Sequence, residues 1–263
     1  MSYSRLPFEQ YFINSSEDYN RTGKTTRGLT YTGLEYPCKG LLHRLAGIRH
    51  EVNFEIHYEP DRDAIQINFE KTMGASDWFA NVVESGSEYY DAITFEGKPL
   101  QLRVHTGWAE MYLAAKRIIR RQWQLCHDRH PTAETEIIGW SLGSGQAMLC
   151  AQDLNYNFGL RSHLFTFGSV RPFQGDGEND EALRRYLDTL CAECWNFSDV
   201  NDVISYMPPF KHWTAIRRVD VETEDRSALR LLNPWKYHAY YDDPALYAKF
   251  KTDEKFETAE KNS

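Results

Sequence analysis

The chain has 263 residues, 41% of them hydrophobic, which is enough for one large domain with a sizeable core. Its 38 acidic and 30 basic side chains give a net charge of −8, which disfavours nucleic acid and anionic membrane surfaces as main partners. No apolar run approaches the roughly 20 residues of a transmembrane helix, and the polar N-terminus lacks the apolar core of a signal peptide. We therefore expect a cytoplasmic protein, or one exported without a leader, with no integral membrane segment.

The first 36 residues are polar and rich in turn-forming residues. We expect an N-terminal arm or cap over residues 1–36, followed by a single domain over residues 37–263. Residues 23–26 (GKTT) look like the end of a phosphate-binding loop, but Asp18 replaces the first glycine of that loop and no apolar strand precedes it. The sequence therefore does not predict nucleotide binding.

The following elements alternate between strands and helices. Residues 52–58 alternate apolar and polar side chains, residues 60–63 favour a turn, and residues 64–69 form a second strand, so together they predict a hairpin. The spacing of apolar residues and the lengths of the segments then predict four helices, over residues 106–127, 146–154, 180–191 and 244–250. They also predict three strands, one that ends at residue 138 and two over residues 163–168 and 194–198. This order predicts an α/β fold whose mixed, mostly parallel central sheet is flanked by helices.

Residues 139–143 read Gly-Trp-Ser-Leu-Gly between an apolar strand and a helix. This is the context of a nucleophile elbow, a strained turn that holds a serine hydroxyl above the sheet. Gly139 and Gly143 are needed because a Cβ atom at either position would crowd the turn. The pattern predicts Ser141 as a nucleophile and the N–H of Leu142 as an oxyanion donor. A glycine-rich turn in another α/β fold is the alternative.

A serine hydroxyl needs a general base, usually histidine, and a carboxylate that orients this base. In enzymes with a nucleophile elbow, the acid and then the histidine follow the serine along the chain. Asp202 follows a predicted strand, where open parallel sheets place their sites, and Asp199 is the local alternative. Beyond Asp202 the sequence contains two histidines, His212 and His238.

Four segments resemble the class 3 lipase family of α/β-hydrolases, in the correct order along the chain. Residues 202–209 (DVISYMPP) look like the acid loop, and residues 67–72 (INFEKT) with Asp77 and Trp78 look like the oxyanion loop and the helix after it. Residues 104–108 (VHTGW) and 166–172 (TFGSVRP) resemble a helix start and a strand end. Trp140, Glu70–Lys71 and Ser205 depart from the family pattern, in which His, Arg-Gly and Pro are usual.

The resemblance implies a fold, a set of site residues and an activity. The fold would be that of an α/β-hydrolase, and the triad would be Ser141, Asp202 and His238, because residues 238–241 match the His-x-x-Tyr of the family. Thr72 would join Leu142 in the oxyanion hole. Residues 74–83 would correspond to a lid helix, and we expect three aromatic side chains at the lid or substrate pocket: Trp78, Phe79 and Trp140.

The resemblance also implies roles for two further histidines, and the spacing of the cysteines bears on metal binding. His105 would be structural and would hold the oxyanion loop, and His212 would be a non-catalytic histidine of the family. Cys191 and Cys194 form a single Cys-x-x-Cys without a second ligand pair, so we expect reduced thiols and no metal site. The chemistry needs no metal or organic cofactor.

These expectations predict a serine hydrolase that cleaves carboxylic esters through an acyl-enzyme, with lipid or acylglycerol esters as the leading substrates. A small-ester or feruloyl-type esterase on the same scaffold is one alternative. A non-catalytic α/β-hydrolase-like interaction protein is an alternative from another class, and Lys71 and Ser205 are the residues that favour it.

Overall fold

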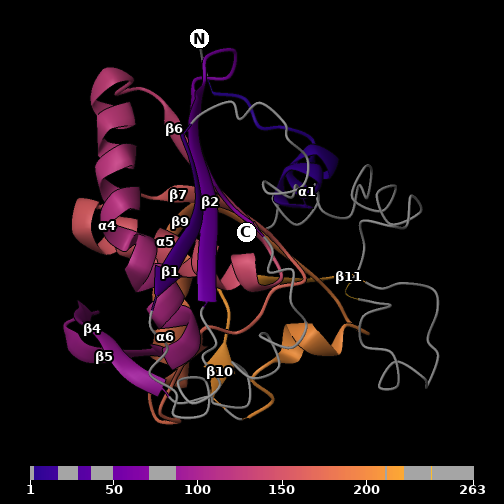
Figure 1. The fold of residues 1–263 in the computed structure, drawn as a ribbon. Coiled ribbons are helices and arrows are strands. Elements are labelled where there is room, and N and C mark those ends of the chain that lie inside the picture. The colour runs from indigo at the N-terminus through magenta and orange to yellow at the C-terminus, as the bar shows by residue number, and fades with distance from the viewer. Residues whose placement is uncertain are drawn as a thin grey trace.

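The computed structural model describes residues 3–16, 29–36, 50–70, 87–210, 212–221 and 238. Within these residues, a seven-stranded sheet has the strand order β1-β2-β3-β6-β7-β9-β11 (Figure 1). β1, β2 and β3 pair antiparallel, and every later pairing, from β3–β6 to β9–β11, is parallel. The strands are β1 (Leu29–Tyr36), β2 (His50–Glu59), β3 (Ala64–Phe69), β6 (Glu134–Trp140), β7 (Ser162–Phe167), β9 (Cys191–Asp199) and β11 (Arg218–Val221).

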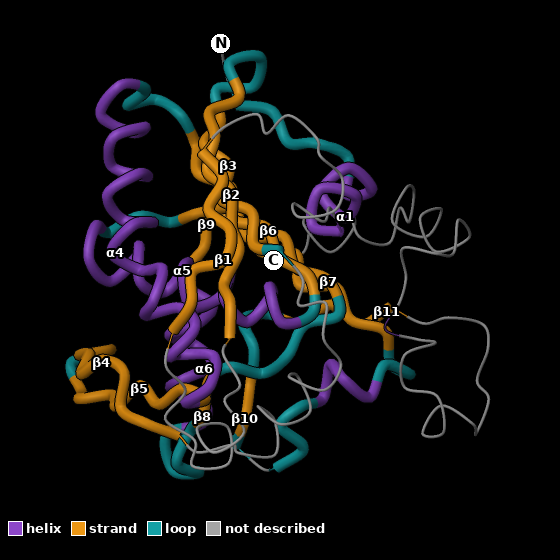
Figure 2. Tube along the Cα trace, in the orientation of Figure 1, coloured by secondary structure: helices purple, strands orange, loops and turns teal. Residues whose placement is uncertain are grey.

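Helices cover both faces of this sheet (Figures 1 and 2). α4 (Thr106–Arg129) and α5 (Leu142–Phe158) lie on one face, and α1 (Phe8–Ser16) lies on the other. The mixed, mostly parallel sheet between helices confirms the predicted fold class. A second sheet has the order β10-β8-β5-β4, with β4 (Ser87–Phe95), β5 (Lys98–His105), β8 (Phe173–Gln174) and β10 (Trp213–Thr214). The described residues also include α6 (Asp180–Thr189) and the 3₁₀ turn η1 (Val203–Tyr206).

The central strand β6 shows how the sequence specifies this layering. Ile137 belongs to the core that includes α4 and α5, whereas its neighbour Ile138 packs in a second core with Tyr11 and Phe12 of α1. Successive side chains of a strand point to opposite faces, so a strand covered on both faces is apolar at consecutive positions. Among the described residues, no helix is both long enough and apolar enough to cross a membrane.

The element boundaries differ from the sequence-based expectations mainly at their ends. The predicted hairpin is formed by β2 and β3, and the helix predicted over 106–127 is α4. The helix after the elbow continues to Phe158, where Gly159 ends it in a left-handed conformation with φ 67°. Cys191, which we expected at the end of a helix, instead starts β9 and pairs with Ser162. The helix expected over 244–250 lies outside the described residues.

Two elements within residues 1–36 belong to the central layers. β1 pairs antiparallel with β2 at the edge of the seven-stranded sheet, and α1 packs on β6 and β7. The first 36 residues therefore contribute a strand and a covering helix to the sheet. The division into an arm and a domain at residue 36 stays a prediction.

A buried carboxylate on β6 holds the N-terminal segment against the sheet. Glu136 is fully buried and accepts hydrogen bonds from the hydroxyls of Tyr3 and Tyr11. Arg62 adds two bonds of 2.8 Å, one to each carboxylate oxygen, and Gln66 adds one of 2.7 Å. Burial by itself raises the pKa of Glu136, but these donors and the Arg62 charge outweigh it and lower the pKa.

The variant Glu136→Gln tests this anchor. It should lower the free energy of unfolding by about 3–5 kcal/mol, because Arg62 keeps a charge in a buried site without its partner. The pKa of Glu136 is lower in the folded state than its ordinary value of 4.5, which we take for the unfolded chain. The ionised carboxylate therefore contributes its full stabilisation above pH 4.5, and this contribution declines as the pH falls through the folded-state pKa. The difference between wild type and variant in urea unfolding should therefore narrow below about pH 4.5.

Glu181→Gln is the matched control, because Glu181 is an exposed carboxylate that pairs with Arg185 on the surface of α6. It should change the free energy of unfolding by about 1 kcal/mol or less. A difference between wild type and Glu136→Gln that widens on acidification would contradict the assignment.

Candidate active site

The turn between β6 and α5 has the geometry expected of a nucleophile elbow. Ser141 has φ 56° and ψ −123°, a conformation that L-residues rarely adopt. A Cβ atom on Gly139 would lie 2.3 Å from the carbonyl oxygen of Gly143, and one on Gly143 would lie 2.7 Å from the carbonyl oxygen of Phe69. Both glycines are therefore required by backbone contacts, and the strained turn predicted from the sequence is present.

A chain of two hydrogen bonds starts at the hydroxyl of Ser141. His238 Nε2 lies 2.6 Å from Ser141 Oγ, and His238 Nδ1 lies 2.8 Å from Asp202 Oδ2. An ionised carboxylate can only accept, so Nδ1 carries the proton, and unprotonated Nε2 accepts the hydroxyl hydrogen of Ser141. Asp202 and His238 are buried, and Ser141 retains 9% of its surface. The structure thus brings the three residues together in the order expected of a nucleophile, a base and an orienting acid.

The loop after β9 fixes the carboxylate. Asp202 Oδ1 accepts a hydrogen bond of 2.9 Å from Ile204 N at the start of η1, which leaves Oδ2 for His238. The alternative acid, Asp199, accepts a bond of 2.7 Å from Asn201 N through its Oδ1. The alternative base, His212, is exposed and contacts Asp180 at 2.6 Å. The geometry therefore favours Asp202 over Asp199 and His238 over His212.

Gly168, at the end of β7, leaves room for the histidine, a role that the sequence analysis did not assign. It has φ 54°, and a Cβ atom there would lie 3.2 Å from Nδ1 and Cε1 of His238. Trp140 is buried with its ring 5.7 Å from that of His238 and 6.0 Å from that of Phe12 on α1. Trp140 thus supports the histidine, and its expected part in a substrate pocket stays a prediction.

The expected oxyanion hole is described only in part. Leu142 is the first residue of α5, so its N–H belongs to the first turn, where the N–H groups have no partner within the helix. The other expected donor, Thr72, lies outside the described residues, as do Lys71, Trp78 and Phe79. Asn14 of α1 holds the end of β3 just before this loop, because its carbonyl accepts a 2.8 Å bond from Asn68 Nδ2.

His105 is fully buried between aromatic rings. Its ring stacks on that of Trp108 at 4.1 Å and lies 5.6 Å from that of Trp213. Burial lowers the pKa of His105 to about 4, so the imidazole is neutral at pH 7. Neither ring nitrogen has a hydrogen-bond partner within the described part of the chain. This packing agrees with a structural role, whereas the expected support of the oxyanion loop stays a prediction.

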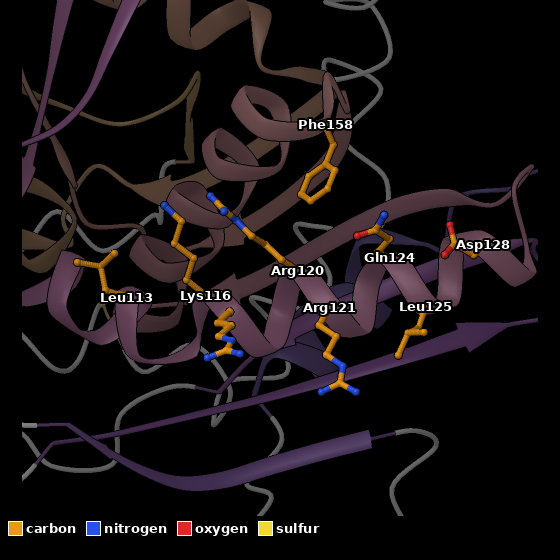
Figure 3. A pocket seen from close by; sticks show the side chains of 9 residues that line it. Leu113, Lys116, Arg120, Arg121, Gln124, Leu125, Asp128 and Phe158 are labelled. Atoms are coloured by element: carbon orange, nitrogen blue, oxygen red, sulfur yellow. The ribbon is translucent and has the colours of Figure 1, made fainter.

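The cysteines and the acidic side chains show no metal site within the described ranges. Cys126, Cys150, Cys191 and Cys194 are free thiols, and no three metal-ligating side chains cluster there. A groove of about 520 Å³ runs along α4, with Lys116, Arg120 and Phe158 among its lining residues (Figure 3). No residue that lines this groove belongs to the hydrogen-bonded trio, so it is separate from the candidate active site.

The family assignment follows from a comparison of the sequence with models of protein families. The model described as Lipase (class 3) matches residues 67–212, which is more than half of the chain. The chain therefore belongs to the class 3 lipase family, as the sequence motifs predicted. A comparison with curated proteins found no match.

Solved structures of lipases share the fold. The triacylglyceride lipase of Rhizomucor miehei has 19% identity and a TM-score of 0.50, with 65% of this chain and 62% of that chain covered. Lipase II from Rhizopus niveus has 18% identity and a TM-score of 0.55, with 75% and 66% covered. A triacylglycerol lipase whose catalytic centre is formed by a serine protease triad has 17% identity and a TM-score of 0.55, with 83% and 78% covered. The chain thus spans 62% of the length of the Rhizomucor lipase.

Gly168→Ala tests whether the space beside His238 matters. The added Cβ atom would contact the imidazole, and a displaced base should lower kcat/KM for an ester by about tenfold to a hundredfold. Gly177→Ala is the matched control, because Gly177 also has a positive φ, and its Cβ atom would contact the exposed His212 at 3.2 Å. Equal losses of activity in the two variants at similar thermal stability would show that the contact with His238 is unimportant.

Proposed function

We propose that this chain hydrolyses carboxylic esters, with lipid or acylglycerol esters as its substrate class, through an acyl-enzyme on Ser141. The observation that carries the proposal is the chain of hydrogen bonds from Ser141 through His238 to Asp202. Membership of the class 3 lipase family supports the same activity. A solved structure of similar fold, described as a triacylglycerol lipase with a serine protease triad, supports the nature of the catalytic residues.

In the first half of this reaction, His238 Nε2 removes the proton as Ser141 Oγ attacks the ester carbonyl. The resulting imidazolium is stabilised by the buried carboxylate of Asp202, and it then donates its proton to the leaving alcohol. In the second half, His238 accepts a proton from a water molecule as the water attacks the acyl carbon. It returns this proton to Ser141 Oγ as the bond between the acyl carbon and Oγ breaks and the carboxylic acid leaves. Since Asp202 also fixes the tautomer, the base needs no rearrangement before the attack.

Negative charge on the carbonyl oxygen requires donors that are in position before the reaction. We assign this role to the N–H groups of Leu142 and Thr72, together with the hydroxyl of Thr72. A single donor of this kind is worth roughly 3–4 kcal/mol in the transition state. The α5 dipole adds to the stabilisation, because the helix begins directly after Ser141 and its N-terminus carries partial positive charge.

The runner-up substrate class is a small or feruloyl-type ester. A series of p-nitrophenyl esters of increasing acyl length, tested below and above the concentration at which the substrate aggregates, separates the two classes. Lipid-ester hydrolysis predicts a rate that rises with acyl length and increases further above that concentration. A preference for acetate esters with simple saturation would favour the small-ester class.

A non-catalytic interaction protein is the alternative from another class. The buried hydrogen bonds of Asp202 and His238 argue against it, because a scaffold without chemistry has no need to align a carboxylate, an imidazole and a strained serine. Complete inactivity on the entire ester series by a folded protein would favour this alternative.

The triad variants test the assignment of roles. Ser141→Ala and His238→Ala should each lose nearly all esterase activity, and the double variant should lose no more, because the residues act as one unit. Asp202→Asn should lower kcat by roughly 10⁴, since the amide favours the wrong tautomer of His238. His212→Ala is the control and should retain full activity. Loss of turnover in His212→Ala with retention in His238→Ala would show that the histidine assignment is wrong.

Thr72→Val tests the second oxyanion donor. The substitution keeps the volume and the backbone N–H but removes the hydroxyl, so the rate should fall by roughly tenfold to a thousandfold. The loss should appear in kcat more than in KM, because the charge exists only in the transition state. An unchanged kcat in steady-state kinetics would mean that the hydroxyl takes no part.

A further inference from the structure

A second pocket, of about 540 Å³, lies beside the loop that carries Asp202. Its walls come from the residues after β7, from α6, from η1 and from the segment that leads into β11. None of its lining residues belongs to the triad. The charged lining residues are Arg171, Arg184, Arg217 and Arg218, together with Asp188 and Asp220. Four arginines against two aspartates leave an excess of positive charge, in a chain whose net charge is −8.

Two of these arginines lie close enough to repel each other. The guanidinium carbons of Arg171 and Arg218 lie 5.0 Å and 4.2 Å from the ring centroid of Tyr206. Burial and the Arg218 charge lower the pKa of Arg171. Within the described part of the chain, the Arg171 side chain makes no hydrogen bond or ion pair, and its guanidinium lies over the Tyr206 ring. Asp220 pairs with Arg218 at 2.5 Å, so the partly buried charge of Arg171 is the one without an ion-pair partner among the described residues.

The pocket also contains buried donors that have no partner among the described residues. Arg218 donates to Asp220 at 2.5 Å and to the carbonyl of Ser205 at 3.0 Å, but its Nη2 is buried and has no partner among the described residues. The same holds for the hydroxyl of Ser169, a residue that is only 2% exposed. Buried donors without partners are rare in folded proteins and commonly mark the position of a ligand, ion or water.

We propose that this pocket binds a phosphomonoester, whose phosphate dianion contacts Arg171, Arg218 and the hydroxyl of Ser169. A dianion matches the excess charge, and its several oxygen acceptors suit three donors that come from two segments, the residues after β7 and the start of β11. The volume exceeds what a phosphate ion fills, so an organic group fits beside the phosphate. The residues of this site are distinct from those that we assign to ester cleavage, so its occupancy can be measured without reference to activity.

Ser205 connects the pocket to the acid loop. Its carbonyl accepts from Arg218, and its hydroxyl donates to the carbonyl of Asp202 at 2.8 Å. A ligand that holds Arg218 therefore stabilises the loop that carries the triad carboxylate. Binding should raise the melting temperature of the full chain, because a ligand that binds only the folded state stabilises it by mass action.

Isothermal titration calorimetry of the full chain with phenyl phosphate, inorganic phosphate and benzoate tests the proposal. Phenyl phosphate should bind at pH 7.5 about tenfold more tightly than benzoate, which presents one charge and two acceptors. Its affinity should fall as the pH is lowered from 7.5 to 5.5, because the dianion takes up a proton near pH 6 while the arginines stay charged. Inorganic phosphate should compete for the same site.

Three variants locate the site. Arg171→Gln and Ser169→Ala should each weaken binding of phenyl phosphate, the first by at least about tenfold, because hydrogen bonds between charged groups are the strong class. Arg218→Gln should do the same, provided that its circular dichroism and melting show a folded protein. Arg117→Gln is the matched control, because Arg117 is exposed on α4 and lines the other groove.

Several results with the soluble ligands and the variants would overturn the proposal. One is that neither phenyl phosphate nor inorganic phosphate binds, and another is that benzoate binds as tightly as phenyl phosphate. A third is that Arg171→Gln leaves the affinity for phenyl phosphate unchanged. A fourth is that Arg117→Gln weakens binding as much as Arg171→Gln does, which would indicate general attraction to surface arginines. Binding to vesicles that contain phosphatidic acid, without binding of the soluble phosphates, would also overturn it, since that result points to a lipid surface. Binding that survives in an inactive Ser141→Ala variant would support the phosphate site independently of the ester hydrolysis.

Discussion

The close approach of two backbone segments at residues 139–143 is the constraint on which the rest of the site depends. A Cβ atom on Gly139 or Gly143 would overlap carbonyl oxygens at 2.3 Å or 2.7 Å. With glycine at both positions, α5 starts directly at the end of β6, and Ser141 takes its strained φ of 56°. Apolar side chains buried on both faces of β6, which lies between β3 and β7 in the sheet, offset the unfavourable energy of this backbone strain.

The position of the serine hydroxyl then determines where its partners have to lie. Asp202 and His238 come from segments 61 and 97 residues farther along the chain, as the numbering of these residues shows. The parallel order of β6, β7 and β9 brings the ends of the strands to one edge, where Gly168 makes space for the imidazole. On the face of the sheet that α1 covers, Phe12 packs against Trp140, so the N-terminal helix supports the strand that carries the elbow.

The sequence predicted those features that local patterns encode. The elbow has a motif, the hairpin of β2 and β3 has alternation and a turn, and α4 has a long apolar periodicity, so each was recognisable. α1 was missed because it has only 9 residues, and the rest of the N-terminal segment is mostly polar. β8 and β10 have two residues each, too few for any periodicity. The buried ion pair of Glu136 with Arg62 could not be predicted either, because Arg62 lies in a predicted turn, and turns are usually exposed to solvent.

The arginine pocket illustrates the same limit. Arg171, Arg184 and Arg218 come from three separate segments with no regular spacing, so only the tertiary fold brings them together. By contrast, the histidine of the proposed triad was chosen from two candidates by a family motif, and the hydrogen bonds of His238 give a physical reason for preferring it. Sites built from residues that are far apart in the sequence can therefore be recognised only when the fold shows which side chains lie close together.

The proposed chemistry requires that the imidazole of His238 makes the hydroxyl of Ser141 nucleophilic. Labelling of the full chain with a fluorophosphonate, followed by peptide mapping by mass spectrometry, measures this reactivity without any assumption about the substrate. We expect one adduct per chain, located on Ser141, and a labelling rate that falls to near zero in His238→Ala. An unlabelled folded protein, an adduct on another serine, or equal labelling of His238→Ala would contradict the proposed chemistry.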